Sequence, residues 1–493
     1  MAKAIMIQGT MSGAGKSLVS AALCRIFAQE GYKTAPFKSQ NMALNSFITR
    51  DGLEMGRAQA MQAEAAGTEP SVLMNPILLK PTTDIGSQVI VNGEVIGNMS
   101  ASDYFRRKKE LIPEILRAYN ELDKMYDVIV IEGAGSPVEL NLKTDDIVNM
   151  GMAKLVNAPV ILVGDIDRGG IFAQLLGTLS LLDKDELDMV KGVMVNKFRG
   201  DKSLFESGVK ILEERGKKPV VGVIPYVNCD IDDEDSLSDK LLKKNSGLID
   251  IAVIRLPRIS NFTDFDVFSQ YSDVSVRYAS KIEELGEPDM IIIPGTKSTL
   301  ADMKWLRTSG LEAAVKKCVS HDIPIFGICG GYQMLGRKIS DPENTEGGGE
   351  ISGMGLLDTE TIFRKNKTRT RITGEIFSAD GFFSCICGAS FEGYEIHMGD
   401  TLVKENPLAY LSDGRKDGSY QKNIAGSYVH GFFDKKEISG NIVKALFRKK
   451  GLEYGGVSID RTAYKESQYD ILANAVRENI DMELLFRILM EGV

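Results

Sequence analysis

A cysteine stands between an apolar run and a helix-like run in the stretch PIFGICGGYQMLG, residues 324–336. The apolar run predicts a buried strand, and YQML has helical spacing. Gly330 and Gly331, directly after Cys329, allow a sharp turn because glycine adopts backbone angles that other residues avoid. A cysteine at such a turn lies near a helix N-terminus, which favours the thiolate. The pattern predicts a nucleophile elbow, and a buried structural cysteine is the alternative.

A cysteine nucleophile needs a base within hydrogen-bonding distance, and the chain has three histidines. His321 precedes the predicted strand, so we expect it at the end of the strand opposite Cys329. His397 and His430 each close a predicted strand, in GYEIHMG and SYVHGFF. Spacing alone does not separate these two. We favour His430 as the base and expect His397 to line the pocket.

Another strand, MIII, ends in the loop PGTKST one helix before the elbow. The backbone N–H groups of such a loop can stabilise a developing negative charge on a carbonyl oxygen. We therefore expect Gly295, together with Gly330, to belong to an oxyanion hole and substrate pocket opposite Cys329.

The beginning of the chain carries a second chemical motif. A short apolar strand leads into GTMSGAGKS, residues 9–17, and a helix-like run follows. Strand, glycine-rich loop and helix form a phosphate cradle, with the lysine on the terminal phosphates and the hydroxyl on Mg²⁺. Thr10 stands where the strict pattern has glycine, and a simple glycine-rich turn is the alternative. The predicted ATP site consists of Gly13, Gly15, Lys16 and Ser17.

Glu132 closes the apolar strand VIVIE. Binding sites in open parallel sheets gather at the carboxyl ends of the strands. A carboxylate at that edge suits Mg²⁺ coordination or the orientation of water beside ATP.

The length of 493 residues predicts two or three domains. Strands alternate with helices, which favours an α/β fold with a doubly wound parallel sheet. An acidic, polar stretch lies at 229–244, and a new α/β run begins at Ile249. We expect a P-loop-type ATP-binding domain over 1–245, a second α/β domain over 246–440 and a helical extension over 441–493.

The composition excludes several classes of protein. Lys and Arg total 59 against 68 Asp and Glu, a net charge of −9, which disfavours nucleic acid and membrane surfaces as partners. No apolar run has the length of a membrane span. MAKAIMIQGT leads straight into a predicted strand and is not typical of a signal peptide. Six scattered cysteines fit a reduced cytoplasm. The oligomeric state stays open.

An ATP site and a cysteine nucleophile in separate domains predict a two-step reaction. One domain activates a carboxylate by phosphorylation, and the other releases ammonia from an amide. Ammonia then displaces phosphate, which requires its transfer shielded from water, because ammonium is unreactive.

Cys329 and His430 in this arrangement resemble the class I, triad-type glutamine amidotransferase domain. The resemblance implies that Cys329 forms a glutamyl thioester and that His430 is the general base. The usual third residue is a glutamate two positions after the histidine, where this chain has Phe432. That departure is similar to the cobyrinate-amidating branch of the family and implies a Cys–His dyad.

The N-terminal half resembles the dethiobiotin-synthetase-like ATPases, whose loop also begins with GT and ends in GK and a hydroxyl residue. Similarity to the cobyrinate-amidating branch extends over about residues 1–440, through PFKSQNMALNS, GRAQAMQAEAAG, EGAGSPVELNL, DIDRGGIFAQLLGTL, VNKFRGD, RLPRISNFTDFD, PGTKST and SYVHGFF. It implies amidation of the b, d, e and g carboxylates of adenosylcobyrinic acid a,c-diamide, a corrinoid polycarboxylate, with ATP, Mg²⁺ and glutamine, in cobalamin biosynthesis.

The same resemblance assigns further residues. Lys38 matches a second phosphate-contacting lysine, and Glu132 and Glu54 match Mg²⁺ ligands beside Ser17. Three arginines are candidates for binding the corrinoid carboxylates, because guanidinium pairs with carboxylates bidentately, and structural ion pairing is their alternative. They are Arg57, Arg168 and Arg199.

Other functions compete with this one. The synthase that makes the a,c-diamide shares both domains and the dyad, and the distinction depends on the segments quoted above. A lipid II amidotransferase subunit is a further relative, but its two activities usually occupy separate chains. From another class, a partition-type ATPase module would bind partners or DNA and leave the Cys–His domain unexplained.

Overall fold

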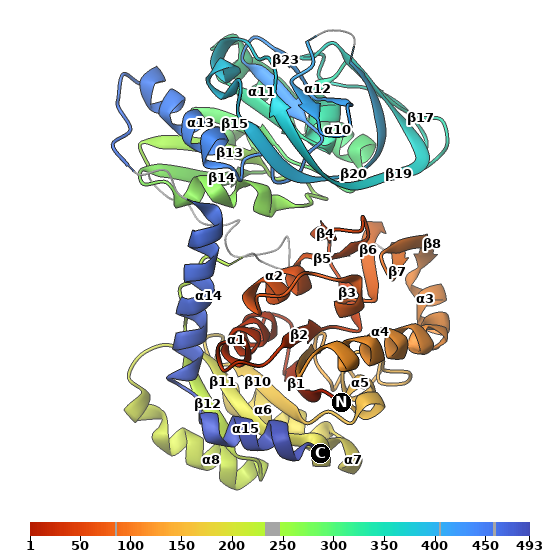
Figure 1. Ribbon diagram of the computed structural model, residues 1–493, viewed down its shortest axis with the longest axis vertical. Helices are drawn as coiled ribbons and strands as arrows, with labels where there is room; N and C mark the ends of the chain where they lie inside the picture. Colours follow the sequence, from red (N-terminus) through yellow and green to blue (C-terminus); the bar gives the residue numbers. More distant parts are fainter. Residues whose placement is uncertain (84–85, 232–246, 404–405, 457–459) are drawn as a thin grey trace. The chain divides into compact units, whose positions relative to one another are not determined.

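The computed structural model describes residues 1–83, 86–231, 247–403, 406–456 and 460–493 (Figure 1). The described chain divides into two compact units. Unit 1 contains residues 1–43, 54–231 and 465–493, and unit 2 contains residues 44–53 and 247–464. Each unit therefore includes a segment that is distant in sequence from the rest of it.

A six-stranded parallel sheet forms the centre of unit 1, in the order β12-β11-β10-β1-β9-β2. The inner strands are apolar runs without alternation, because helices cover both faces of a parallel sheet. The chain leaves β1 for one edge and later returns to its other side, which places the loop after β1 at a topological switch point. The strands are β1 Lys3–Gly9, β2 Thr34–Phe37, β9 Val128–Glu132, β10 Val160–Asp165, β11 Val190–Phe198 and β12 Val220–Pro225.

Helices and a smaller sheet complete unit 1. The helices are α1 Lys16–Gln29, α2 Arg57–Ala65, α3 Ala101–Arg107, α4 Ile112–Met125, α5 Met150–Val156, α6 Ile171–Leu181, α7 Lys184–Met189, α8 Glu206–Gly216 and α15 Met482–Glu491. The smaller sheet contains β3 Gln40–Met42, β6 Ile77–Thr83, β7 Gly86–Val91 and β8 Glu94–Ser100, and β5 is Glu54–Gly56.

Unit 2 also has a six-stranded sheet, in the order β14-β13-β15-β16-β24-β23, of which the first five strands are parallel. Its strands are β13 Ile249–Ile254, β14 Val274–Ala279, β15 Met290–Ile293, β16 Ile325–Ile328, β23 Ser419–Gln421 and β24 Ile424–Ser427. A second sheet contains β17 Lys338–Asp341, β18 Gly349–Ser352, β19 Thr359–Ile376, β20 Ser390–Val403, β21 Ala409–Leu411 and β22 Lys416–Asp417.

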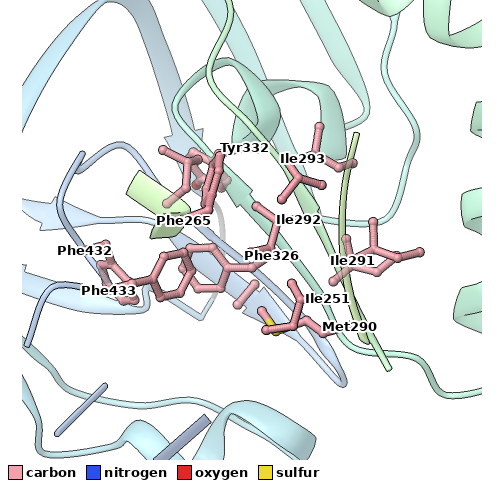
Figure 2. Close-up of a cluster of buried hydrophobic side chains, with 14 of the residues drawn as sticks. Ile251, Phe265, Met290, Ile291, Ile292, Ile293, Phe326, Tyr332, Phe432 and Phe433 are labelled. Atoms are coloured by element: carbon pink, nitrogen blue, oxygen red, sulfur yellow. The ribbon is translucent and has the colours of Figure 1, made fainter. Parts of the chain in front are cut away.

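The helices of unit 2 are α9 Ile282–Leu285, α10 Thr299–Thr308, α11 Leu311–Ser320, α12 Gly330–Leu335 and α13 Lys436–Lys449, with the 3₁₀ helix η5 Phe262–Gln270. β4, Ser46–Ile48, also belongs to this unit. Aromatic rings fill its core beside β15 and β16 (Figure 2). The ring centroid of Phe326 lies 5.0 Å from those of Phe432 and Phe433. Phe432 is thus a core residue, fully buried.

The expected domain boundary near residue 245 lies outside the described residues. The expected C-terminal extension, 441–493, is not a separate part in the structure, because it is divided between the units. α13 buries an apolar stripe in unit 2, whereas α15 packs in unit 1, with Phe486 5.7 Å from Phe27 between ring centroids. α14, Arg461–Arg477, begins in unit 2 and continues into unit 1.

The described residues contain no helix with both the length and the apolar character that crossing a bilayer requires.

Candidate active sites

The turn between β16 and α12 is a strained elbow. Cys329 has φ 50° and ψ −107°, a conformation that is rare for a residue with a side chain and costs about 1–3 kcal/mol. A Cβ at Gly331 would lie 1.9 Å from the carbonyl oxygen of Ile293, and one at Gly330 would lie 2.8 Å from Cγ2 of Thr296. The close approach of β15 and its loop therefore requires both glycines.

His430 lies beyond the end of β24, the strand next to β16 in the sheet. Its ring is 1% exposed and interacts electrostatically with the Cys329 side chain. Nδ1 lies 2.7 Å from Oδ2 of Asp264, on the first turn of η5. Oδ1 of Asp264 also accepts the backbone N–H of Gly431, at 3.1 Å. Cysteine, histidine and carboxylate thus form one buried group of interacting side chains.

The charges around His430 favour the protonated, charged form of its imidazole ring. Burial disfavours the charged ring, but the Asp264 carboxylate and Cys329 outweigh it and raise the pKa of His430 to about 10. At neutral pH both ring nitrogens of His430 therefore carry a proton, and Nδ1–H donates to Asp264. Such a pairing supplies a cysteine nucleophile together with a proton for the leaving group.

The structure corrects the expected Cys–His dyad by adding a third residue, Asp264, beside His430. The position of the usual glutamate is occupied by Phe432, which is buried among other rings, and the carboxylate comes from a loop more than 160 positions earlier in the chain. Sequence reasoning identified the segment RLPRISNFTDFD as distinctive but did not assign its acid. The available signal was an acid shortly after the predicted strand IDIAVI, at the edge where the other site residues were expected.

The other residues predicted for the pocket, Gly295 and His397, lie on segments that contact His430 and Cys329. A Cβ at Gly295 would lie 3.1 Å from Cε1 of His430, so its loop reaches the histidine. The Cys329 thiol lies 3.7 Å from the carbonyl oxygen of Ile396, the residue before His397. His397 stacks on Tyr428 at 3.8 Å between ring centroids, and its Nδ1 lies 2.8 Å from the carbonyl oxygen of Gly399.

His321 is at the other end of the strand, as expected. It follows α11 and precedes β16, whereas Cys329 follows β16, and it is exposed. It therefore has no place in the cysteine site.

The loop after β1 has the backbone that a phosphate cradle needs. Gly13 and Gly15 have φ values of 74° and 92°, which favour glycine. A Cβ at Gly15 would lie 2.1 Å from Nδ2 of Asn196, whose amide donates to the carbonyl oxygen of Ala14 at 2.9 Å. α1 begins at Lys16, so its N-terminus faces the loop. Lys16 Nζ donates to the carbonyl oxygens of Met11 and Gly135, both at 3.0 Å.

Glu132, at the end of β9, gathers the polar groups of this site. Its Oε1 accepts from Ser17 Oγ and from Lys38 Nζ, each at 2.9 Å, and its Oε2 accepts from Gln62 Nε2 at 2.5 Å. The structure thus brings the predicted Ser17, Lys38 and Glu132 together. A hydroxyl and a carboxylate beside a left-handed glycine loop are the donor set that Mg²⁺ and nucleotide phosphates take, so these residues fit the expected ligands.

Glu54 is placed differently from the expected third metal ligand. It is fully buried and accepts from Lys80 Nζ at 2.9 Å, so its charge is already balanced by an ammonium group. Its role as a metal ligand stays a prediction. Gln62, which sequence reasoning did not select, donates a hydrogen bond to Glu132, whereas Glu54 pairs with Lys80.

The three candidate arginines all have carboxylate neighbours. Arg57 lies 3.1 Å from Glu64, and Arg199 lies 2.7 Å from Asp167. Arg168 lies 3.8 Å from Asp165 and keeps 62% of its side chain exposed. These contacts match the ion-pairing alternative, although the guanidinium groups of Arg168 and Arg199 are exposed and therefore accessible to a ligand as well.

Both halves of the chain match known protein families. Residues 250–438 match a family model described as a CobB/CobQ-like glutamine amidotransferase domain. Residues 5–237 match one described as a CobQ/CobB/MinD/ParA nucleotide binding domain. These matches confirm the predicted fold class, a P-loop-type α/β domain followed by a glutaminase-type α/β domain.

Full-length relatives are also found. The cobyric acid synthase of Lachnoclostridium phytofermentans is 57% identical, with 100% of both chains covered. That of Ruminiclostridium cellulolyticum is 56% identical and covers 100% of this chain and 98% of its own. That of Alkaliphilus metalliredigens is 50% identical over 98% of this chain and 99% of its own. With two family models along the chain and relatives of this identity over its full length, the chain belongs to the cobyric acid synthase family.

Proposed function

We propose that this chain uses ATP and glutamine to amidate the b, d, e and g carboxylates of adenosylcobyrinic acid a,c-diamide, giving adenosylcobyric acid in the cytoplasm. The observation that carries this proposal is the presence, in one chain, of the Cys329–His430–Asp264 site and the phosphate loop with Glu132. A partition-type ATPase would have no use for the first of these sites.

In unit 2, the Cys329 sulfur attacks the side-chain amide carbon of glutamine. The carbonyl oxygen becomes an oxyanion that backbone N–H groups near Gly295 and Gly330 stabilise. His430 gives its proton to the nitrogen, the C–N bond breaks and ammonia leaves a glutamyl thioester. Water then attacks the thioester carbon, His430 takes the proton, and glutamate and the free cysteine are restored. Asp264 holds Nδ1–H and keeps the ring oriented.

In unit 1, the loop N–H groups, Lys16 and Lys38 hold the ATP phosphates, and Ser17 and Glu132 would hold Mg²⁺, which neutralises phosphate charge when bound. A substrate carboxylate oxygen attacks the terminal phosphorus and yields an acyl phosphate and ADP. Ammonia then attacks the acyl carbon, phosphate leaves and a proton is released, which completes the amide. Lys16 stabilises charge on the transferred phosphoryl group and the leaving ADP.

Recognition of the corrinoid carboxylates must be local, because the net charge of the chain is −9. Arg168 and Arg199 lie after β10 and at the end of β11, at the same edge as the phosphate loop. Arg199 also stacks on the exposed ring of Tyr226, 3.6 Å from its centroid. We assign these two arginines to the substrate in preference to Arg57, which is buried beside Glu64.

The test is a reaction with ATP, Mg²⁺, glutamine and adenosylcobyrinic acid a,c-diamide, followed by mass spectrometry of the corrinoid. Each step replaces OH by NH₂, so the expected result is four successive small decreases in mass. If cobyrinic acid is accepted in its place and two steps are seen, the chain is instead an a,c-diamide synthase. If neither corrinoid changes, the acceptor in this proposal is wrong.

A further inference from the structure

The turn that leads into Asp264 begins at Asn261, which is held by several hydrogen bonds. Asn261 has φ 52°, and its carbonyl oxygen accepts the backbone N–H of Asp264 at 3.1 Å. Its own N–H donates to Oδ1 of Asn45 at 2.8 Å, and its Oδ1 accepts the N–H of Ser46 at 3.1 Å. Asn45 and Asn261 are 1% and 3% exposed. This buried reciprocal pair fixes the turn from which Asp264 reaches the histidine.

The same short segment also contacts the support of His430. The hydroxyl of Tyr394 donates to the carbonyl oxygen of Ser46 at 3.0 Å, and the ring of Phe47 lies 6.1 Å from that of Tyr394. Tyr394 stacks on His430 at 5.3 Å between centroids and exchanges both backbone hydrogen bonds with it, at 3.1 and 2.9 Å. Residues 45–47 therefore support both members of the Asp264–His430 pair.

Residues 44–53 belong to unit 2, although the residues on both sides of them, 1–43 and 54–231, belong to unit 1. Before it, Lys38 bonds to Glu132 in the phosphate site, and Ser39 Oγ donates to the carbonyl oxygen of Ile147 at 2.7 Å. After it, Glu54 forms its buried pair with Lys80. The residues that flank the segment 44–53 on each side are thus held by buried polar contacts within the ATP-binding unit.

A second segment repeats this arrangement. Arg461, on the first turn of α14, pairs with Asp434 and donates to the carbonyl oxygen of Thr263, the neighbour of Asp264, at 3.2 Å. Further along α14, within unit 1, Lys465 and Tyr469 contact Glu64 at 3.2 and 3.0 Å. Two segments therefore hydrogen-bond to the turn that carries Asp264, residues 44–53 and the start of α14. The polypeptide continues from each of them into the ATP-binding unit.

We propose that residues 44–53 form a coupling segment in which Asn45 and Ser46 position Asp264 and His430, so that glutamine hydrolysis depends on what unit 1 has bound. The inference rests on the proposed glutaminase. Its physical basis is that a shift of the segment is transmitted through short buried hydrogen bonds, and the productive geometry of a catalytic pair tolerates little displacement. Asn45 is a positioning residue and does not touch the substrate.

The test compares Asn45→Ala with Asn45→Asp, which keeps the oxygen that accepts from Asn261. Asp51→Ser, at an exposed site of the same segment, is the control. Three rates are measured: glutamine hydrolysis with and without ATP, Mg²⁺ and corrinoid, alkylation of Cys329 by iodoacetamide, and amidation driven by ammonium. We expect Asn45→Ala to slow hydrolysis about tenfold, as displaced catalytic groups do, to slow alkylation and to lose the response to unit 1 ligands. Ammonium-driven amidation should persist, Asn45→Asp should retain more glutamine hydrolysis than Asn45→Ala because it keeps the acceptor oxygen, and Asp51→Ser should resemble the wild type.

The proposal is overturned if Asn45→Ala hydrolyses glutamine at the wild-type rate with the wild-type response to ATP and corrinoid. If this variant loses both activities and melts at a lower temperature, Tyr394→Phe decides, because it removes only the hydroxyl that holds Ser46. An unchanged hydrolysis rate and ligand response in Tyr394→Phe would then overturn the coupling. A wild-type enzyme that fails to hydrolyse glutamine at all would instead refute the proposed function.

Discussion

The two sites lie at the same kind of place, the carboxyl edge of a six-stranded sheet, but they are assembled differently. The phosphate loop is one contiguous stretch, residues 9–17, to which Glu132 and Lys38 are added. The cysteine site takes Cys329, His430 and Asp264 from three loops that are distant in the chain. A contiguous motif can be recognised in a sequence, whereas the pairing of Asp264 with His430, which depends on the fold, was not identified from it.

Their charges are balanced differently too. In the phosphate site, Glu132 is shared among an ammonium, a hydroxyl and an amide. In the cysteine site, a single carboxylate acts on a single imidazole. Four substitutions, two in each site, measure how strongly each site depends on its individual groups.

The largest effect is expected for Cys329→Ala, which removes the nucleophile. Glutamine-dependent amidation should fall by at least about 10⁴-fold, while ammonium still supports the reaction. The two nitrogen sources are compared in the same corrinoid mass assay. Loss of the ammonium-driven reaction as well would show that the two sites are not separable as described.

Lys16→Ala comes next. It removes the ammonium group that contacts the loop and Gly135, and amidation from either nitrogen source should fall by about 10²- to 10³-fold. Glutamine hydrolysis, measured as glutamate release, should continue. Unchanged ATP-dependent turnover would contradict the assignment of the phosphate loop.

Asp264→Asn should reduce glutamine hydrolysis by about 10²-fold, less than in serine triads, because a thiol is the better nucleophile. The substitution removes the carboxylate that helps raise the pKa of His430 to about 10. The imidazolium should therefore lose its proton at a lower pH in the variant. We expect activity to decline with rising pH earlier than in the wild type, as measured by pH–rate profiles. Coincident profiles would mean that Asp264 does not act on His430.

The smallest effect is expected for Thr10→Gly, which restores the strict loop pattern. Thr10 Oγ1 donates to Gln174 at 3.1 Å, a neutral contact worth about 1 kcal/mol. The KM for ATP should change by less than about fivefold. A larger change would make Thr10 part of the nucleotide site, and the phosphate loop would then be less self-contained than it is described here.

Much of the fold could be predicted, because strands, glycine loops and helices alternate with clear local signals. The elbow at Cys329 and the loop at Gly13 and Gly15 are local turns with glycine requirements, and both were predicted from adjacent residues. Asp264 was not, because its relation to His430 depends on the packing of η5 against the end of β24. For the same reason, nothing in residues 44–53 indicated that they belong to unit 2.

The position of α15 has a consequence for synthesis on the ribosome. Leu485, Ile488 and Leu489 lie in the same apolar core as residues of β1 and α1, so a helix that is synthesised after unit 2 covers part of unit 1. The core of unit 1 is therefore incomplete until α15 has been synthesised, whereas the core of unit 2 is already available after α13. The nascent N-terminal half therefore carries an exposed apolar surface through most of its emergence and is open to chaperones during that time.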